Sequence, residues 1–165
     1  MTAIRSIVVG TSIVGCLLAP ISGYAESGTY SQVVSLVTNY TKSERGSETV
    51  IGGSSSGTVT TIHSSGGPFI EGSSGLFECI VFAKRSGTGM DLEAPCTSTD
   101  SSGDKVFSVA KRKAGDVNPG GGGEGRSELL GGTGKYSGIT GSCEYRADYL
   151  VGNHVVTISK FQWQK

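Results

Sequence analysis

The sequence predicts an all-β fold: a small antiparallel eight-stranded barrel that follows an N-terminal signal peptide. Three observations predict it. Runs rich in β-branched and aromatic residues are separated at short intervals by clusters of Gly, Ser, Asn and Asp. Beyond the first 25 residues, no long stretch has the apolar period of a helix. About eight such runs follow one another, and a closed barrel of about eight strands encloses side chains or one small ligand.

Residues 1–25 have the layout of a secretory signal peptide. Arg5 supplies a positive charge, residues 6–21 carry no charged side chain, and Gly23-Tyr24-Ala25 places small residues just before a cleavage site. We therefore expect one mature domain of residues 26–165, secreted or located in the periplasm, with no integral membrane segment after cleavage.

Cys16 provides an alternative to simple secretion. Ile13-Val14-Gly15-Cys16 loosely resembles a bacterial lipobox, in which the cysteine becomes the lipidated first residue. The residues that follow it are apolar, whereas lipoproteins usually continue with a polar tether. Under this alternative the domain is anchored to a membrane by lipid.

The charge balance excludes a general attraction to polyanions. The chain has 14 basic and 14 acidic residues, so neither nucleic acid nor an anionic membrane surface is an expected partner. Lys111-Arg112-Lys113 is a local basic cluster at a strand end. We interpret it as a solvated edge, with phosphate binding as the less favoured alternative.

Three cysteines remain if the signal peptide is removed, namely Cys79, Cys96 and Cys143. An odd number in an exported protein suggests one disulfide and one free or buried thiol. Cys79 and Cys96 flank a hairpin-like segment and are a plausible pair, although the sequence does not determine the pairing. Cys143 lies among apolar residues and could be a small core filler.

Four strands are expected in the first half of the mature chain. Residues 29–41 carry alternating apolar side chains. Residues 48–52 and 57–63 form one strand interrupted by Gly and Ser, as a loop or as a bulge at a barrel corner. Residues 75–85 contain the densest apolar run, and residues 90–97 follow a Gly-Thr-Gly turn.

The second half continues in the same way. Residues 105–113 return after a turn at residues 100–104, where Asp, Ser and Gly suit a tight backbone. Residues 118–125 include four consecutive glycines and are expected to be a floppy connector, with a mobile flap over the barrel mouth as the alternative. Residues 126–130 form a short strand.

A hairpin of residues 142–151 and 154–163 closes the chain. A two-residue Gly152-Asn153 turn would pair Val151 with His154. The predicted core face then carries Cys143, Tyr145, Ala147, Tyr149, Val156 and Ile158. The other face carries Glu144, Arg146, Asp148, Leu150, Val155, Thr157, Ser159, Phe161 and Trp163. We interpret this mixed face as a solvated exterior, with a polar barrel lumen as the alternative.

Familiar catalytic and ligand-binding motifs are incomplete. Gly132-Thr133-Gly134-Lys135 lacks the remaining residues and the helix of a phosphate-binding loop. Asp100-x-Ser102-x-Asp104 lacks the later ligands of a calcium loop. The two histidines, His63 and His154, have no neighbouring partner in the sequence that suggests a nucleophile or a metal pair. The sequence predicts no cofactor and no metal.

The run from Gly131 to Gly141, Gly-Gly-Thr-Gly-Lys-Tyr-Ser-Gly-Ile-Thr-Gly, resembles a segment of the allene oxide cyclase and dirigent barrel proteins. The resemblance extends through Leu150 and covers about a sixth of the chain. It implies an eight-stranded calycin-like barrel with an apolar cavity, sometimes in a homo-oligomer. Some members of that superfamily cyclise or couple small molecules. Their catalytic carboxylates and prolines have no matching positions here.

Three functional hypotheses follow. The first is a non-enzymatic barrel that holds a small apolar ligand, with a cavity lined by Phe, Val, Ile and Tyr. The second is a cyclase-like or dirigent-like enzyme that acts by confining its substrate, with Glu144, Arg146 and Asp148 as the candidate inward polar residues. The third is an oligomeric structural or envelope protein with a filled barrel and an apolar outer patch.

Overall fold

The computed structural model describes residues 26–112 and 122–165. The expected signal peptide with Cys16, Lys113 and the first half of the predicted 118–125 connector, residues 118–121, lie outside the described residues. The second half of that prediction is wrong at Gly123–Gly125, which belong to β6. The strands are β1 (Ser27–Arg45), β2 (Glu48–Ser64), β3 (Ser74–Ser86), β4 (Gly89–Asp100), β5 (Lys105–Arg112), β6 (Gly123–Gly132), β7 (Thr140–Tyr149) and β8 (His154–Gln164). Within these residues, no helix combines the length and the apolar composition needed to cross a membrane.

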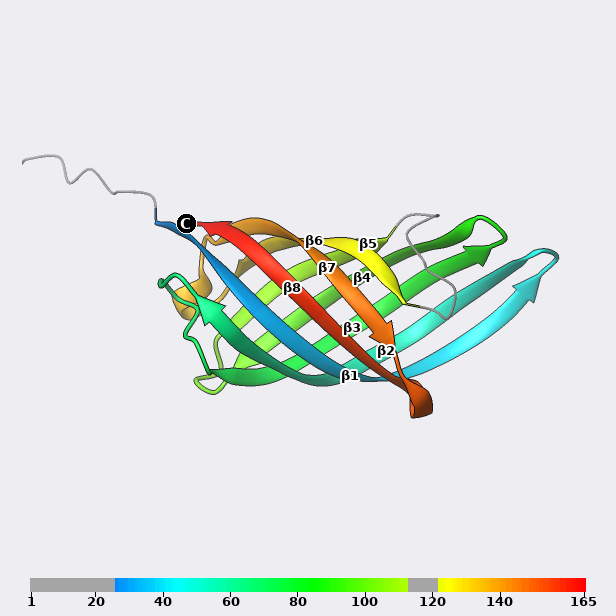
Figure 1. The fold of residues 1–165 in the computed structure, drawn as a ribbon, viewed down its shortest axis with the longest axis horizontal. Coiled ribbons are helices and arrows are strands. Elements are labelled where there is room, and N and C mark those ends of the chain that lie inside the picture. The colour runs from blue at the N-terminus through cyan, green and yellow to red at the C-terminus, as the bar shows by residue number, and fades with distance from the viewer. Residues whose placement is uncertain (1–25, 113–121) are drawn as a thin grey trace, which may run out of the picture.

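The eight strands form one closed antiparallel barrel, which confirms the predicted fold class (Figure 1). Each strand pairs with the next in sequence, and β8 pairs with β1 to close the sheet. The β1–β2 and β3–β4 hairpins project beyond the rest of the barrel at one end (Figure 1). Because the sheet is closed, it has no edge strand, and alternate side chains of every strand point inward.

β2 is continuous through its Gly and Ser run, so the expected interruption at residues 52–56 is wrong. Every residue from Gly52 to Ser56 pairs with both β1 and β3. At Gly53, where φ is 156°, an added β-carbon would overlap the carbonyl oxygen of Asn39 on β1. Glycine therefore allows close backbone approach inside a regular strand instead of ending it.

The closing hairpin differs by one residue from the predicted register. The structure pairs Tyr149 with Val155, and the loop contains the three residues Val151–Asn153 instead of two. Gly152 and Asn153 both have left-handed φ values, 70° and 64°. Since side chains alternate along a strand, this one-residue shift exchanges the inward and outward faces of β8. Val155, Ser159, Phe161 and Trp163 are therefore buried, whereas Ile158, a predicted core residue, is exposed and Val156 is only partly buried. On β7 the predicted core face is confirmed for Cys143, Tyr145 and Ala147, which are buried, whereas Tyr149 is only partly buried.

Aromatic side chains fill the end of the barrel at which β1 begins. Phe69, from the loop between β2 and β3, stacks on Tyr30 with ring centroids 3.6 Å apart. Tyr30 in turn stacks on Phe161 at 4.9 Å, and Phe69 contacts Tyr136 and Trp163. All five side chains are buried. This end of the barrel is therefore packed with side chains.

The glycine-rich run and the Asp100–Asp104 turn lie side by side at the same end. A short 3₁₀ helix, Gly134–Tyr136, places Lys135 Nζ 2.5 Å from Asp100 Oδ2. The Lys135 backbone N–H donates to Asp104 Oδ2 at 3.3 Å. Gly134 has a φ of 51°, and a β-carbon there would overlap the Asp104 carboxylate. Both motifs thus build a tight corner of the barrel.

Candidate functional site

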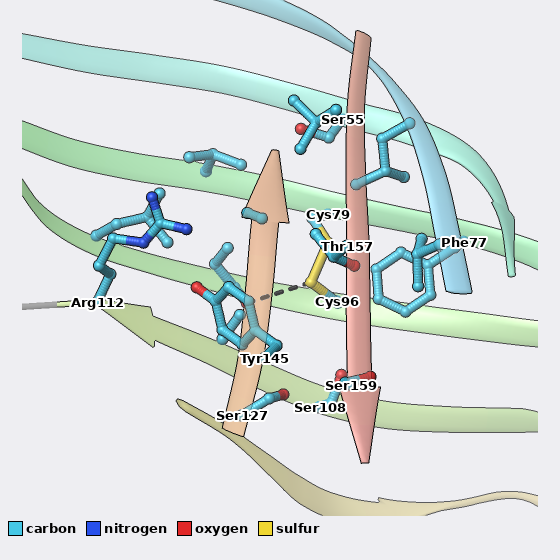
Figure 2. A pocket seen from close by; sticks show the side chains of 18 of the residues that line it. Ser55, Phe77, Cys79, Cys96, Ser108, Arg112, Ser127, Tyr145, Thr157 and Ser159 are labelled. Atoms are coloured by element: carbon cyan, nitrogen blue, oxygen red, sulfur yellow. Dashed lines mark hydrogen bonds between the residues drawn. A yellow bond between two sulfur atoms is a disulfide. The ribbon is translucent and has the colours of Figure 1, made fainter. Parts of the chain in front are cut away.

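The barrel interior contains a cavity of about 90 Å³ between the aromatic end and the opposite mouth. Figure 2 shows most of the side chains that line it, and the full set comes from the inward positions of all eight strands. Most are apolar, among them Val34, Val81, Leu92, Ala94 and Val155. The inward alternation of the sheet creates this apolar wall, because every second residue of each strand faces the barrel axis.

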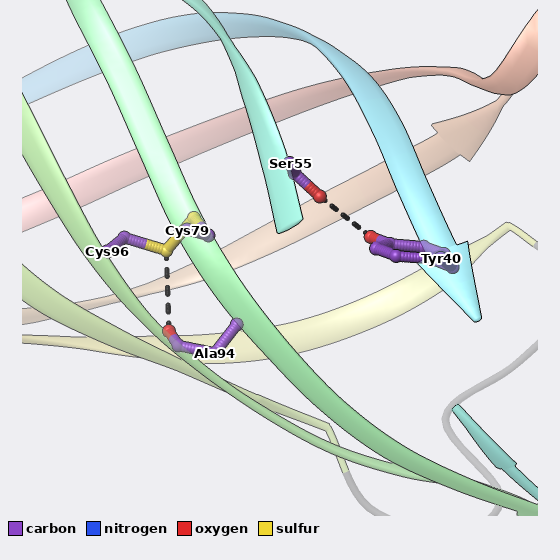
Figure 3. The surroundings of a disulfide bond; sticks show 5 residues. All are labelled: Tyr40, Ser55, Cys79, Ala94 and Cys96. Atoms are coloured by element: carbon purple, nitrogen blue, oxygen red, sulfur yellow. Dashed lines mark hydrogen bonds between the residues drawn. A yellow bond between two sulfur atoms is a disulfide. The ribbon is translucent and has the colours of Figure 1, made fainter. Parts of the chain in front are cut away.

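A disulfide forms part of the cavity wall. Cys79 on β3 and Cys96 on β4 are direct cross-strand partners with Cα atoms 4.1 Å apart, and they are bonded to each other (Figure 3). The pairing suggested by their position around a hairpin is therefore confirmed. Figure 3 also shows the Tyr40 hydroxyl beside Ser55 Oγ, 2.8 Å away, so these two lining groups satisfy each other.

Arg112, the last residue of β5, points into the barrel and is 3% exposed. Its Nη2 donates a long hydrogen bond of 3.4 Å to the Gly123 carbonyl oxygen. Within the described part of the chain, its Nε and Nη1 have no hydrogen-bond partner and no ion pair includes it. The interpretation of residues 111–113 as a solvated edge is therefore wrong for Arg112. β5 continues the inward parity of Ser108 and Ala110, which also line the cavity.

Tyr145 on β7 lies beside the Arg112 guanidinium (Figure 2). The guanidinium carbon is 5.7 Å from the ring centroid, which is within the range of a cation–π contact. Burial raises the pKa of Tyr145, and the positive charge of Arg112 opposes that rise. Gly125 on β6 makes room for the ring, since a β-carbon there would overlap the phenol group. Together these contacts hold Arg112 at the cavity.

Cys143 also lines the cavity and has no disulfide partner. Burial raises the pKa of its thiol to about 12, so the group is protonated at neutral pH. The nearby Ser159 hydroxyl is buried and has no close hydrogen-bond partner among the described residues, and its weak interaction with the thiol opposes part of the rise in that pKa. A protonated, buried thiol is a poor nucleophile, so this part of the wall offers polarity but no activated catalytic group.

Glu144, Arg146 and Asp148 lie on the outside of the barrel. Their side chains are 83%, 65% and 45% exposed. Arg146 Nη2 is 2.8 Å from Asp148 Oδ2, and Glu144 Oε1 is 3.7 Å from Nη2 of Arg126. The expectation of an inward polar triad at these positions is wrong, because even-numbered residues of β7 face outward. Their interpretation as solvated ion pairs fits the structure.

The two histidines lie apart from the cavity. His63 is exposed and its Nδ1 is 3.4 Å from Glu71 Oε2, while His154 is exposed at the start of β8. Among residues 26–112 and 122–165, no group of His, Cys, Asp and Glu side chains is arranged to hold a metal ion. The side chains at the cavity are suited to binding through apolar contact and one cationic group. Inward parity along β5, with Ser108, Ala110 and Arg112 on one face, was the sequence signal that could have identified Arg112 as a cavity residue.

Comparison of the chain with protein-family models, with curated proteins and with solved structures gave no match.

Proposed function

We propose that this chain is an exported barrel protein that binds a small, largely apolar molecule in the barrel interior. The apolar cavity of about 90 Å³, which reaches from the aromatic end to Arg112, is the observation that carries the proposal. Apolar pockets with a few placed polar groups are typical of small-molecule sites. The Cys79–Cys96 disulfide supports export, because disulfides persist mainly in oxidising compartments.

The size of the cavity limits the occupant. Small-molecule pockets commonly enclose about 300–1,000 Å³. A cavity of about 90 Å³ has room for roughly three waters at about 30 Å³ each. The proposed ligand is therefore a molecule, or the buried end of a molecule, with only a few non-hydrogen atoms.

The test uses residues 26–165 purified from an oxidising compartment with the disulfide intact. Native mass spectrometry shows whether a small molecule is retained and how many subunits associate. Xenon and 1-butanol then serve as neutral apolar probes, followed through the methyl NMR signals of Val34, Val81 and Val155. We expect saturable shifts at these three cavity residues.

Ala94→Leu should abolish those shifts by filling the cavity, since Ala94 is a buried lining residue. Ser54→Leu is the matched control, because Ser54 is exposed on the outer face of β2. If neither probe shifts the cavity methyl groups and no molecule is retained, the barrel is a filled structural one and the proposal fails.

A further inference from the structure

Arg112 places a permanent positive charge inside a largely apolar barrel. The guanidinium stays protonated in proteins, and burying an ion without a counter-ion is costly. Of its five N–H donors, the three on Nε and Nη1 have no acceptor among residues 26–112 and 122–165. The Gly123 carbonyl accepts a long hydrogen bond, and Tyr145 interacts with the guanidinium through its ring and its hydroxyl, but both of these partners are uncharged. The described part of the barrel therefore lacks an anion where its geometry would accommodate one.

We propose that Arg112 binds the carboxylate of a short-chain monocarboxylic acid whose apolar chain occupies the cavity. This inference rests on the proposed function and specifies the class of ligand. A guanidinium forms strong, charge-assisted hydrogen bonds with a carboxylate, and its planar shape matches that of the anion.

The charge of the cavity wall favours a monoanion. Arg112 is the one charged residue among the described side chains that line the cavity. A single carboxylate would neutralise it, whereas a phosphate dianion would bring a second charge with no further cation among the described lining side chains to meet it. Burial of that extra charge would be unfavourable.

The shape of the cavity favours a chain of a few carbons. Beyond Arg112 the wall is formed by apolar side chains such as Leu92, Ala94 and Val81. A methylene or methyl group takes about the space of one water, so a cavity of about 90 Å³ accepts roughly three of them. Butanoate matches this description, with its carboxylate at Arg112 and three further carbons in the cavity.

The experiment compares butanoate with 1-butanol, its neutral counterpart, by the same methyl NMR signals on residues 26–165. We expect butanoate to bind at least tenfold more tightly than 1-butanol. Chloride and inorganic phosphate are added as competitors at equal ionic strength. Weak competition by both anions supports a site that prefers a carboxylate. Displacement of butanoate by either anion at equal concentration shows instead a simple anion site and overturns the proposed ligand class.

Variants of Arg112 then test whether this residue causes the preference for butanoate over 1-butanol. Arg112→Met should reduce the butanoate to 1-butanol affinity ratio to about one, and Arg112→Lys should leave it intermediate, since lysine lacks the planar fork. Arg126→Met, a change at a side chain that is 82% exposed, should leave the ratio unchanged. Because the ratio is measured within each protein, it is insensitive to a general loss of stability, and Arg112→Lys keeps the test informative if the methionine variant does not fold.

The two proposals fail in different ways. If 1-butanol binds and butanoate binds no better, Arg112 is a structural cation and this inference is overturned while the proposed function stands. If neither molecule reaches the cavity methyl groups, both proposals fail.

Discussion

Gly57 on β2 lies directly against the backbone of Ser35 on β1. A β-carbon at residue 57 would overlap the Ser35 carbonyl oxygen. The two strands pair here in a continuous register, with Gly57 opposite Leu36. The glycine therefore permits a close contact between neighbouring strands in the long β1–β2 hairpin.

Gly57→Ala should destabilise the fold by about 2 kcal/mol or more, because the new methyl group must push two paired strands apart. Gly52→Ala is the matched control on the same strand, since a β-carbon there would meet nothing within 4 Å. We expect Gly52→Ala to change stability by less than about 0.5 kcal/mol. Urea unfolding of both variants measures the difference, and equal effects would contradict this account.

The Asp100–Lys135 ion pair should contribute a pH-dependent stabilisation. Burial acts to raise the pKa of Asp100, but its hydrogen bonds with Lys135 and Ser102 outweigh burial and hold that pKa well below its usual range. A carboxylate with a lowered folded-state pKa stabilises the fold above its unfolded pKa of about 3.9. That contribution is lost as the pH falls through the lower folded-state pKa.

Lys135→Met should therefore cost about 1 kcal/mol at pH 7, a modest value since the lysine side chain is 37% exposed. The difference from the unmodified protein should shrink as the pH falls below about 4. Lys84→Met removes the more exposed Lys84–Glu48 pair and should cost less than about 0.5 kcal/mol. Urea unfolding at several pH values tests this, and a Lys135→Met effect that persists unchanged at pH 2 would argue against the ion pair.

Phe69 should be a major contributor to stability even though it belongs to a loop. It is 7% exposed and stacks on Tyr30. Phe69→Ala should cost about 3 kcal/mol, because it leaves a cavity among the aromatic rings. Phe82→Ala provides the control, as Phe82 is 61% exposed on the outer face and its loss should cost less than about 1 kcal/mol. Thermal or urea unfolding would reveal the contrast, and similar losses for both would show that the loop does not plug the barrel.

The thiol of Cys143 should be unreactive in the folded protein. It is buried, and burial raises its pKa to about 12, so almost no thiolate is present at pH 8. Labelling residues 26–165 with a chromogenic disulfide reagent should give no rapid reaction when folded and one thiol per chain in denaturant. Adding reductant first should give three, as Cys79 and Cys96 are bonded. Rapid labelling of the folded protein would contradict the buried position of Cys143.

Several features of the fold were predictable because they depend on local patterns. The alternation of apolar residues along residues 29–41 and 75–85 marks inward and outward faces regardless of which strand lies alongside. The predicted Cys79–Cys96 pair follows from its position in one hairpin, where direct cross-strand partners are close in sequence. Short-range geometry was sufficient for these features.

The candidate site was harder to predict, since it depends on registers that single residues decide. The Val151–Asn153 loop has three residues instead of two, and that difference turns Val155, Ser159 and Phe161 into the barrel. Arg112 looked like part of an exposed basic cluster, because a run of three basic residues does not reveal which of their side chains points into the barrel. Only its place on the inward parity of β5 makes it a cavity residue.

The amino-acid order by itself thus determined an all-β chain of about eight alternating runs, punctuated by glycines, with a cysteine pair suited to one hairpin. The tertiary structure decided which side chains meet inside the barrel, including the contact of Arg112 with Tyr145 and the pairing of Asp100 with Lys135. The physical reason is that alternation defines two faces of each strand, whereas closure of the sheet and the length of each loop choose which face turns inward and what it meets there.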